Sequence, residues 1–215
     1  MRSKSGTGAR TFADEARRKQ IVACAMDLIA DVGYPRASLA KIAERADIAK
    51  SVVLYHFRDK DELVSAVVET VFATSANIMV PRILSASGAR DRLRAYIESN
   101  GEFLDAHRRP AIALYEISTS YRDRKGRRFD EAIQAAVDDI GVPEQFAPLD
   151  PLSILRSGIQ DGDFVTDVDP IVLKNLIRSA LDGAVAELAR DDTYDVTAHT
   201  SALSKLVLSA IGAPP

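Results

Sequence analysis

The stretch 38-SLAKIAERADIAKSVVLYHF-57 decides how the rest of the chain is read. Ser38 is a favoured helix cap, and the apolar residues after it recur at three- and four-residue steps as far as Ala46, which predicts a short helix. Residues 47–49 then make a tight break, and residues 50–57 are long enough for only two helical turns. Two short helices joined by a tight turn are typical of a helix-turn-helix, whose second helix enters the major groove of DNA.

The second of these helices carries candidate contacts to DNA. Lys50 can reach the acceptors of guanine, and a Val52 methyl group can meet the methyl group of thymine. Tyr55 and His56 are expected near the outer rim, where a hydroxyl or an imidazole can meet phosphate. Lys60, at the start of the next helix, adds a charge and free backbone N–H groups. The candidate DNA-binding residues are Ser38, Lys50, Ser51, Val52, Tyr55, His56 and Lys60.

Charge is unevenly distributed along the 215 residues. The chain has a formal net charge of −3, yet residues 1–60 hold 12 Lys and Arg against 7 Asp and Glu, and the remainder holds 16 against 24. A basic front end on an acidic body suggests that only the front meets a polyanion. A solvated charge fluctuation would give the same counts.

The composition is that of an ordinary globular protein, with 47% hydrophobic and 27% charged residues. The single cysteine, Cys24, cannot form an internal disulfide and is expected to be a small core residue. The N-terminus has no apolar run, and no apolar segment is expected to reach the ~20 residues that a membrane span needs. We therefore expect a cytoplasmic protein without a membrane partner.

Apolar periodicity predicts helices almost throughout, so the expected fold class is all-α. A first helix over 14–32 ends at Gly33, and a long helix begins near Lys60 and runs towards Pro81. Asp150-Pro151 and Asp169-Pro170 each place an acidic helix cap before a proline at the first helical position, so each is expected to start a helix. The other predicted helices are 91–107, 110–121 with Pro110 at its first position, 127–140, 170–190 and 196–211, with one more starting at Pro151.

Residues 17–72 resemble the N-terminal DNA-binding domain of the TetR family of bacterial transcriptional regulators. The likeness is carried by Val32-Gly33-Tyr34, the run SLAKIAERADIAKS, the trio Tyr55-His56-Phe57 and the spacing Phe57-x-x-Lys60-x-x-Leu63. The resemblance implies an all-helical homodimer, a variable C-terminal ligand pocket and release from operator DNA when a ligand binds. It divides the chain into residues 1–60, a three-helix DNA-binding domain with a basic N-terminal tail, and residues 61–215, a helical ligand-binding and dimerisation domain.

The chain departs from the family pattern at two positions in the helix-turn-helix. The family usually has Tyr where this chain has Leu54, and often a basic or polar residue where it has Ala40. Both changes remove plausible DNA contacts. Tyr55 is expected to take over part of the backbone contact, although it could also pack on the surface of the fourth helix.

The last two predicted helices are strongly apolar on one face. This apolar area is larger than a single subunit is expected to bury. They would pair with their copies across a two-fold axis as a four-helix bundle, although burial within one subunit is the alternative. The candidates for this dimer face are Val172, Leu176, Leu181, Val185, Leu203, Leu206 and Ile211.

The middle helices are expected to enclose a mostly apolar pocket with a few polar groups. Asn100 and His107 are seven residues apart, on one helical face, and could donate hydrogen bonds to a ligand. Each candidate also fits plain core packing, and the acidic surroundings slightly favour neutral or cationic ligands. The candidates are Asn100, Phe103, His107, Tyr115, Phe129, Ile133, Phe146 and Leu155.

Two other classes of protein are alternatives to a ligand-responsive repressor. An all-helical enzyme is disfavoured because there is no Glu-x-x-His step, no G-x-S-x-G elbow and no phosphate-binding glycine loop, so no metal site and no cofactor are expected. A constitutive DNA-binding protein without a ligand remains open. The expected partners are a double-stranded DNA operator, a small-molecule effector and a second copy of the chain.

Overall fold

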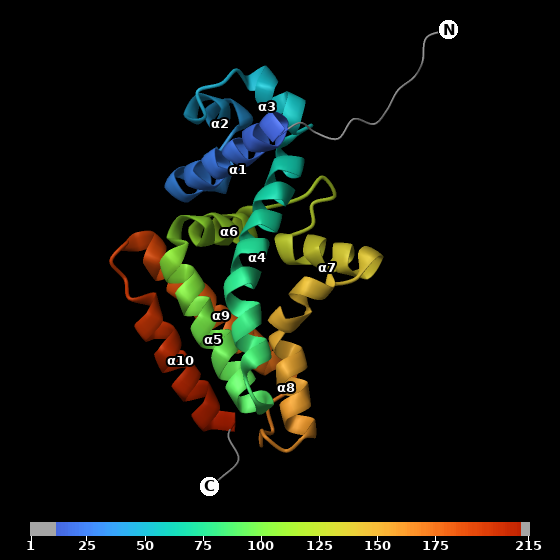
Figure 1. Cartoon of the computed structure of the whole chain (residues 1–215), viewed down its shortest axis with the longest axis vertical. Coiled ribbons are helices and arrows are strands. Elements are labelled where there is room, and N and C mark those ends of the chain that lie inside the picture. The colour runs from blue at the N-terminus through green and yellow to red at the C-terminus, as the bar shows by residue number, and fades with distance from the viewer. Residues whose placement is uncertain (1–11, 212–215) are drawn as a thin grey trace.

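The computed structural model describes residues 12–211, and only the backbone of residue 140. Helices α1–α3 form a compact group at one end, here called the head, and α4–α10 form an elongated body (Figure 1). The basic N-terminal tail lies outside the described residues. The helices are α1 (Phe12–Val32), α2 (Leu39–Arg45), α3 (Lys50–His56), α4 (Lys60–Ser85), α5 (Gly88–Ala106), α6 (Arg108–Ser120), α7 (Phe129–Ile140), α8 (Pro151–Gln160), α9 (Pro170–Arg190) and α10 (Val196–Ile211), with 3-10 helices η1 (Tyr34–Arg36) and η2 (Glu144–Leu149).

The all-α prediction is confirmed, since no strand occurs within residues 12–211 and only an isolated bridge joins Arg122 to Arg128. The acidic caps before proline are also confirmed. Asp150 accepts hydrogen bonds from the backbone at the start of α8, and Asp169 does so for α9. The start of α6 was predicted wrongly: the helix begins at Arg108, so Pro110 is its third residue.

The head is a helix-turn-helix packed on α1. Ser38 caps α2 by accepting a hydrogen bond from the Lys41 backbone, and a positive φ of 52° at Asp47 turns the chain towards α3. Phe57 is fully buried, and the Arg18 guanidinium lies 4.1 Å from the centre of its ring. Large apolar residues at helical spacing therefore anchor α3, which leaves its opposite face free.

Helix α4 runs from the head through most of the body (Figure 1). It continues four residues beyond Pro81, which is exposed in the last turn, because Met79 and Ile83 are buried against the body. By length and composition, α4 could also span a membrane, so the expectation that no segment is apolar enough was wrong. Half of its apolar window is buried within the protein, as for a core helix.

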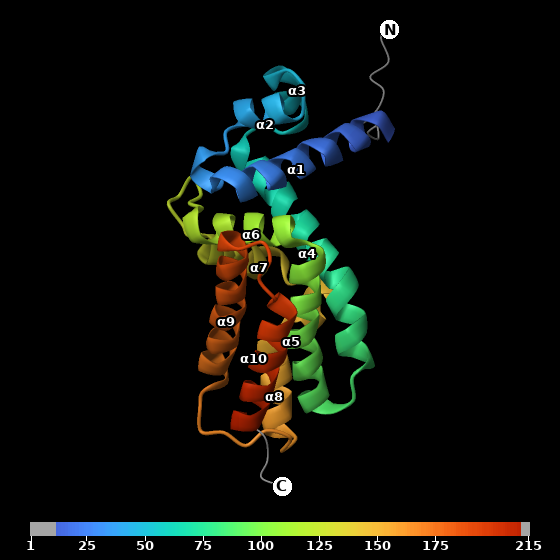
Figure 2. The same cartoon turned by 90° about the vertical axis from the view of Figure 1, so that its left-hand side faces the viewer.

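The body packs around α4 and α5, with α9 and α10 lying side by side on the face shown in Figure 2. Helix α6 lies across the top of the body beneath α1, and one continuous core joins the head to α4, α6 and α9. Helix α10 packs most closely on α5. A Cβ atom added at Gly101 would lie 2.0 Å from the Thr200 hydroxyl oxygen, so this contact needs glycine.

We predict that Gly101→Ala lowers the free energy of unfolding by about 1–3 kcal/mol, because the methyl group forces α5 and α10 apart. Thr200→Ala removes the two side-chain atoms beyond Cβ, so the double variant should recover part of the loss. Urea unfolding of the four proteins measures both effects. Wild-type stability in Gly101→Ala would contradict the packing.

Candidate functional sites

The exposed face of α3 brings together most of the predicted DNA-binding residues. Lys50, Ser51 and Tyr55 are exposed, Tyr55 to 75%, and Val52 is half-buried. Ser38 is exposed at the start of α2. The side chains on α3 lie on a short, well-anchored helix, which is the geometry that presents residues to base edges in a groove.

His56 was expected at the outer rim, and this placement was wrong, because the residue is only 7% exposed. In a two-turn helix, Val53, His56 and Phe57 share the buried face, so the imidazole turns inward. The Arg18 side chain donates to the backbone carbonyl of His56 at 2.9 Å. His56 is therefore a packing residue of the head in this structure.

Sequence reasoning missed one exposed residue of α3. Leu54 is 45% exposed beside Tyr55, although it was regarded only as the loss of a family tyrosine. Residues 51, 54 and 55 follow helical spacing on α3, and this period was the available signal. Arg58, which follows the end of α3, is also strongly exposed, so apolar, aromatic and basic groups are exposed in and just after α3.

Lys60 occupies a more confined place than the sequence suggested. Its ammonium group donates to the carbonyl of Tyr34 at 2.8 Å and lies 3.9 Å from the centre of the Tyr34 ring. Burial lowers the pKa of Lys60, and neighbouring Asp61 opposes that shift. Binding of Lys60 to a DNA phosphate remains a prediction, and it requires the side chain to leave Tyr34.

Arg109 at the start of α6 ties the body to the head. It donates to the Asp27 carboxylate and carbonyl, both at 2.7 Å, and to the Asp31 carboxylate at 2.6 Å. Arg45 of α2 donates to the other Asp31 oxygen at 2.5 Å. The hydrogen bonds from Arg109 and then Arg45 lower the pKa of Asp31. Half-exposed ion pairs are individually weak, but this network fixes α6 against α1 and α2.

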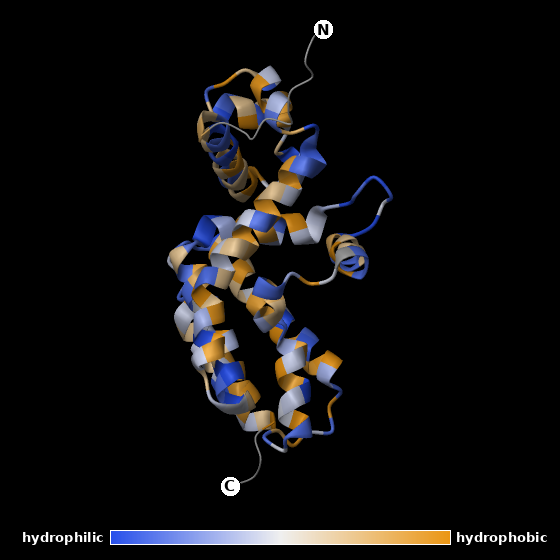
Figure 3. Cartoon of the chain, turned by 45° about the vertical axis from the view of Figure 1, so that its right-hand side comes forward, coloured by the Kyte–Doolittle hydropathy of each residue, from blue (hydrophilic) through white to orange (hydrophobic). Residues whose placement is uncertain are grey.

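A basic hairpin of residues 122–128 makes a second tie, and the loop after α6 is strongly hydrophilic in Figure 3. The Asp123 carboxylate organises it by accepting from the backbone N–H groups of Lys125 and Arg127. Arg124 then reaches the Asp59 carboxylate at 2.5 Å, at the cap of α4. Arg124 also lies 3.5 Å from the Asp61 carboxylate, so the hairpin contacts the start of α4 at two acidic residues.

A cavity of about 600 Å³ lies among α4, α5, α6, α7 and α9, a size typical of small-molecule sites. Most of its wall is apolar or aromatic. Helix α4 contributes Val71, Phe72, Ser75 and Met79, and α6 contributes Ala111, Leu114, Tyr115, Ser118 and Thr119. The helix that begins beneath the head and the helix that carries Arg109 therefore both line the cavity.

Five of the eight predicted pocket residues line this cavity: Asn100, Phe103, Tyr115, Phe129 and Ile133. The other three do not. His107 stacks on Phe103 with ring centres 5.6 Å apart, Phe146 packs towards Phe72, and Leu155 is fully buried in the core at the far end of the body. Helical spacing found the right helices but could not separate the cavity wall from the layer behind it.

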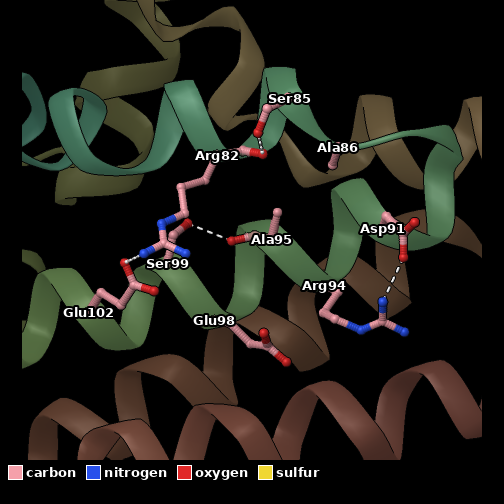
Figure 4. Close-up of a pocket in the computed structure, with 9 residues that line it drawn as sticks. All are labelled: Arg82, Ser85, Ala86, Asp91, Arg94, Ala95, Glu98, Ser99 and Glu102. Carbon is pink, nitrogen blue, oxygen red and sulfur yellow. Dashed lines mark hydrogen bonds and ion pairs between the residues drawn. The ribbon is translucent and has the colours of Figure 1, made fainter.

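A second hollow is a surface groove of about 410 Å³ at the α4–α5 turn (Figure 4). Its charged groups are largely paired with one another. Arg82 reaches across to Glu102 at 2.8 Å, and Arg94 contacts Asp91 at 2.6 Å. This lining offers no apolar surface comparable with that of the larger cavity.

The predicted dimer face is split by the structure. Val172, Leu176 and Leu206 are exposed and Leu203 is half-buried, on the outward sides of α9 and α10. Leu181, Val185 and Ile211 are buried within one subunit, so their assignment to an exposed dimer face was wrong. Leu181 and Val185 instead line the cavity. The apolar periodicity of α9 runs over two faces, which a sequence pattern merges.

Comparisons with known proteins agree with this arrangement. Residues 21–67 match the sequence model of the bacterial regulatory proteins of the tetR family. These residues are similar to the DNA-binding region of TetR-family regulators. The proteins that it resembles are DNA-binding transcription regulators and not enzymes. Among residues 12–211, no group of three or more metal-binding side chains occurs.

Several known proteins are similar to this chain over part or most of its length. The fatty acid metabolism regulator protein of Bacillus subtilis is 21% identical over 194 residues, which cover 89% of this chain and 94% of the relative. The regulator BetI of Yersinia pestis is 33% identical over 86 residues, 39% of this chain and 43% of the relative. FadR of B. subtilis, solved with stearoyl-CoA, has the same fold, with a TM-score of 0.70, 22% identity and coverage of 90% and 98%. A TetR-family regulator from Marinobacter aquaeolei gives 0.72 at 15% identity, covering 94% and 98%.

Proposed function

We propose that this protein is a cytoplasmic repressor that binds palindromic operator DNA as a homodimer and releases it when a small, mostly apolar effector enters the cavity. The observation that carries the proposal is the position of α4. The helix begins directly after the helix-turn-helix, and its middle forms a wall of the cavity. A molecule held there touches the element on which the head is mounted.

The exposed face of α3 supports operator binding. Lys50 and Ser51 would read base edges from the start of the helix, while Tyr55 would contact the backbone beside them. In a two-fold dimer, the two α3 helices would enter the DNA about 34–36 Å apart, or further if the operator is longer. A palindromic site would then mirror the symmetry of the protein.

The outward faces of α9 and α10 support dimerisation. Val172 and Leu176 on α9 and Leu206 on α10 are exposed on neighbouring helices, where single-subunit packing leaves them in water. Gly183 lies on the same side of α9 with open space around it, so a partner helix can approach closely. Two copies of this helix pair would form a four-helix bundle.

The lining of the cavity supports an effector with a large apolar part. The structure of B. subtilis FadR holds stearoyl-CoA, whose acyl chain is apolar, and that protein shares the fold of this chain. A ligand lowers operator affinity only if it prefers the form of the dimer that does not bind DNA. The structural change caused by the ligand would pass through α4 and through α6, whose Arg109 donates hydrogen bonds to Asp27 and Asp31 of the head.

The DNA-binding surface is tested by two lysine variants. Lys50→Ala should weaken operator binding by about 1–3 kcal/mol more than binding to random DNA, because a base contact is lost. Lys60→Ala should weaken binding to all DNA and reduce the slope of log affinity against log salt by about one. Fluorescence anisotropy over a salt series gives both values.

Lys205→Ala on the exposed side of α10 is the matched control for these variants and should leave DNA affinity unchanged. An unchanged salt slope in Lys60→Ala would remove Lys60 from the phosphate contacts and leave it as a structural partner of Tyr34. Equal losses on operator and random DNA in Lys50→Ala would remove its role in base recognition.

The dimer face is tested by Leu206→Glu, which should give monomers that no longer protect an operator. A carboxylate at the centre of the interface must be desolvated without a partner, which costs several kcal/mol. Leu84→Glu is the control, since Leu84 is 66% exposed and Leu206 71%, yet Leu84 lies at the end of α4. If light scattering at micromolar concentration finds Leu206→Glu dimeric, the interface lies elsewhere.

Release is tested by titrating the protein–operator complex with a panel of apolar compounds that carry one or two polar groups. An effector should lower operator affinity roughly 5- to 150-fold, the usual range of coupling between sites. Phe103→Ala and Tyr115→Ala should weaken the response, whereas Phe146→Ala, outside the lining, should retain it. Compounds that bind without changing operator affinity would favour the constitutive DNA-binding protein.

A further inference from the structure

The apolar cavity also carries a row of charged side chains on one wall. Lys174, Arg178 and Asp182 follow one another at four-residue spacing, so they lie on one stripe of α9 that faces the cavity. Arg128 and Asp130 at the start of α7 complete the charged part of the lining. Cations outnumber acids in this wall, in contrast to the acidic character of the body as a whole.

The acids of the lining do not balance its cations. Asp130 lies 3.6 Å from Arg128 and Asp182 is one turn from Arg178, so each acid has a neighbouring arginine. Lys174 is half-buried, and no hydrogen bond or ion pair to its ammonium group occurs among residues 12–211. An ammonium group at an apolar cavity without a counter-charge attracts an anion.

Arg178 has a buried neighbour on α5 at the cavity. Its neighbour Tyr96, a residue of α5 that is almost fully buried and lines the same cavity, raises the pKa of Arg178. Desolvation raises the pKa of Asp182, which the charge of Arg178 partly offsets. Arg178 and Asp182 remain solvent-accessible because they face the cavity, even though protein atoms surround them. The guanidinium lines the cavity and has five N–H donors, so it can bind an anionic ligand.

We propose that Lys174 and Arg178 form an anion-binding site in the cavity, so that the effector is an amphiphile with a negatively charged head and an apolar chain. The inference rests on the proposed function and assigns the chemistry of its ligand. The head would lie against α9, and the chain would extend over Phe72, Phe103 and Leu114 of the apolar wall. The net charge of the chain slightly favoured a neutral or cationic ligand. We infer an anionic one instead, because the charges that line the cavity act on the ligand more strongly than the charge of the whole chain.

A negatively charged head on an apolar chain occurs in several kinds of molecule, including a fatty acid carboxylate, an alkyl phosphate and an acyl-CoA. Matched probes separate them: dodecanoate, dodecyl phosphate and lauroyl-CoA carry anionic heads, whereas dodecanol carries the same chain length with a neutral head. Binding of each to the full-length protein is measured by isothermal titration calorimetry at low and high salt. The same probes are then added to the protein–operator complex in the anisotropy assay.

At least one anionic probe should bind about 10- to 100-fold more tightly than dodecanol, the range of a charge-assisted contact with two cations. Lys174→Gln should remove most of this preference while leaving the affinity for dodecanol unchanged. Lys205→Gln, a lysine on the exposed side of α10, should behave as wild type. High salt should weaken the anionic probe and not the alcohol. The anionic probe that binds most tightly identifies the head group.

Equal affinity for dodecanol and all three anionic probes, or a full preference retained in Lys174→Gln, would overturn the anion site. Absence of binding by every probe would overturn it as well. The proposed repressor function fails separately, when no compound of the wider apolar panel changes operator affinity. A neutral compound that releases the operator would therefore leave the repressor standing and remove the anion site.

Discussion

The apolar surface of α4 must be covered along its whole length, and the rest of the fold depends on this constraint. The helix has 26 residues and would be apolar enough to cross a membrane. The head covers its beginning, where Leu63 and Val67 are buried with Phe57, and α5 covers its end at Ile83. Head and body therefore share one helix instead of meeting at a flexible linker, which makes α4 a mechanical connection between the two.

Polar ties at the surface complete this connection. Arg109 joins α6 to α1, and Arg124 joins the α6–α7 hairpin to the cap of α4. Exposed ion pairs of this kind add little stability, but they respond to small shifts because their geometry is specific. In our proposal, a ligand among α4, α6 and α9 changes the packing of the cavity. These ion pairs then determine how far the head moves with the body helices.

The sequence predicted the order of helices and the helix-turn-helix because those features depend on local period, caps and turns. Gly33, Ser38 and the Asp-Pro pairs each act within a few residues. Burial was harder. His56 turns inward because its helix is short, Leu181 faces the cavity instead of a partner subunit, and Lys60 folds onto Tyr34. Each of these positions is decided by contacts from another element, which periodicity in one segment does not contain.

The central claim is that an effector in the cavity moves the two heads through α4. The most direct measurement is the distance between spin labels at Glu44→Cys in the dimer, by pulsed electron resonance, in a Cys24→Ser background. Glu44 is exposed on α2, and Cys24 is the only other cysteine. We predict that dodecanoate, or the panel compound that most lowers operator affinity, shifts this distance. An unchanged distance with a compound that releases the operator would contradict it.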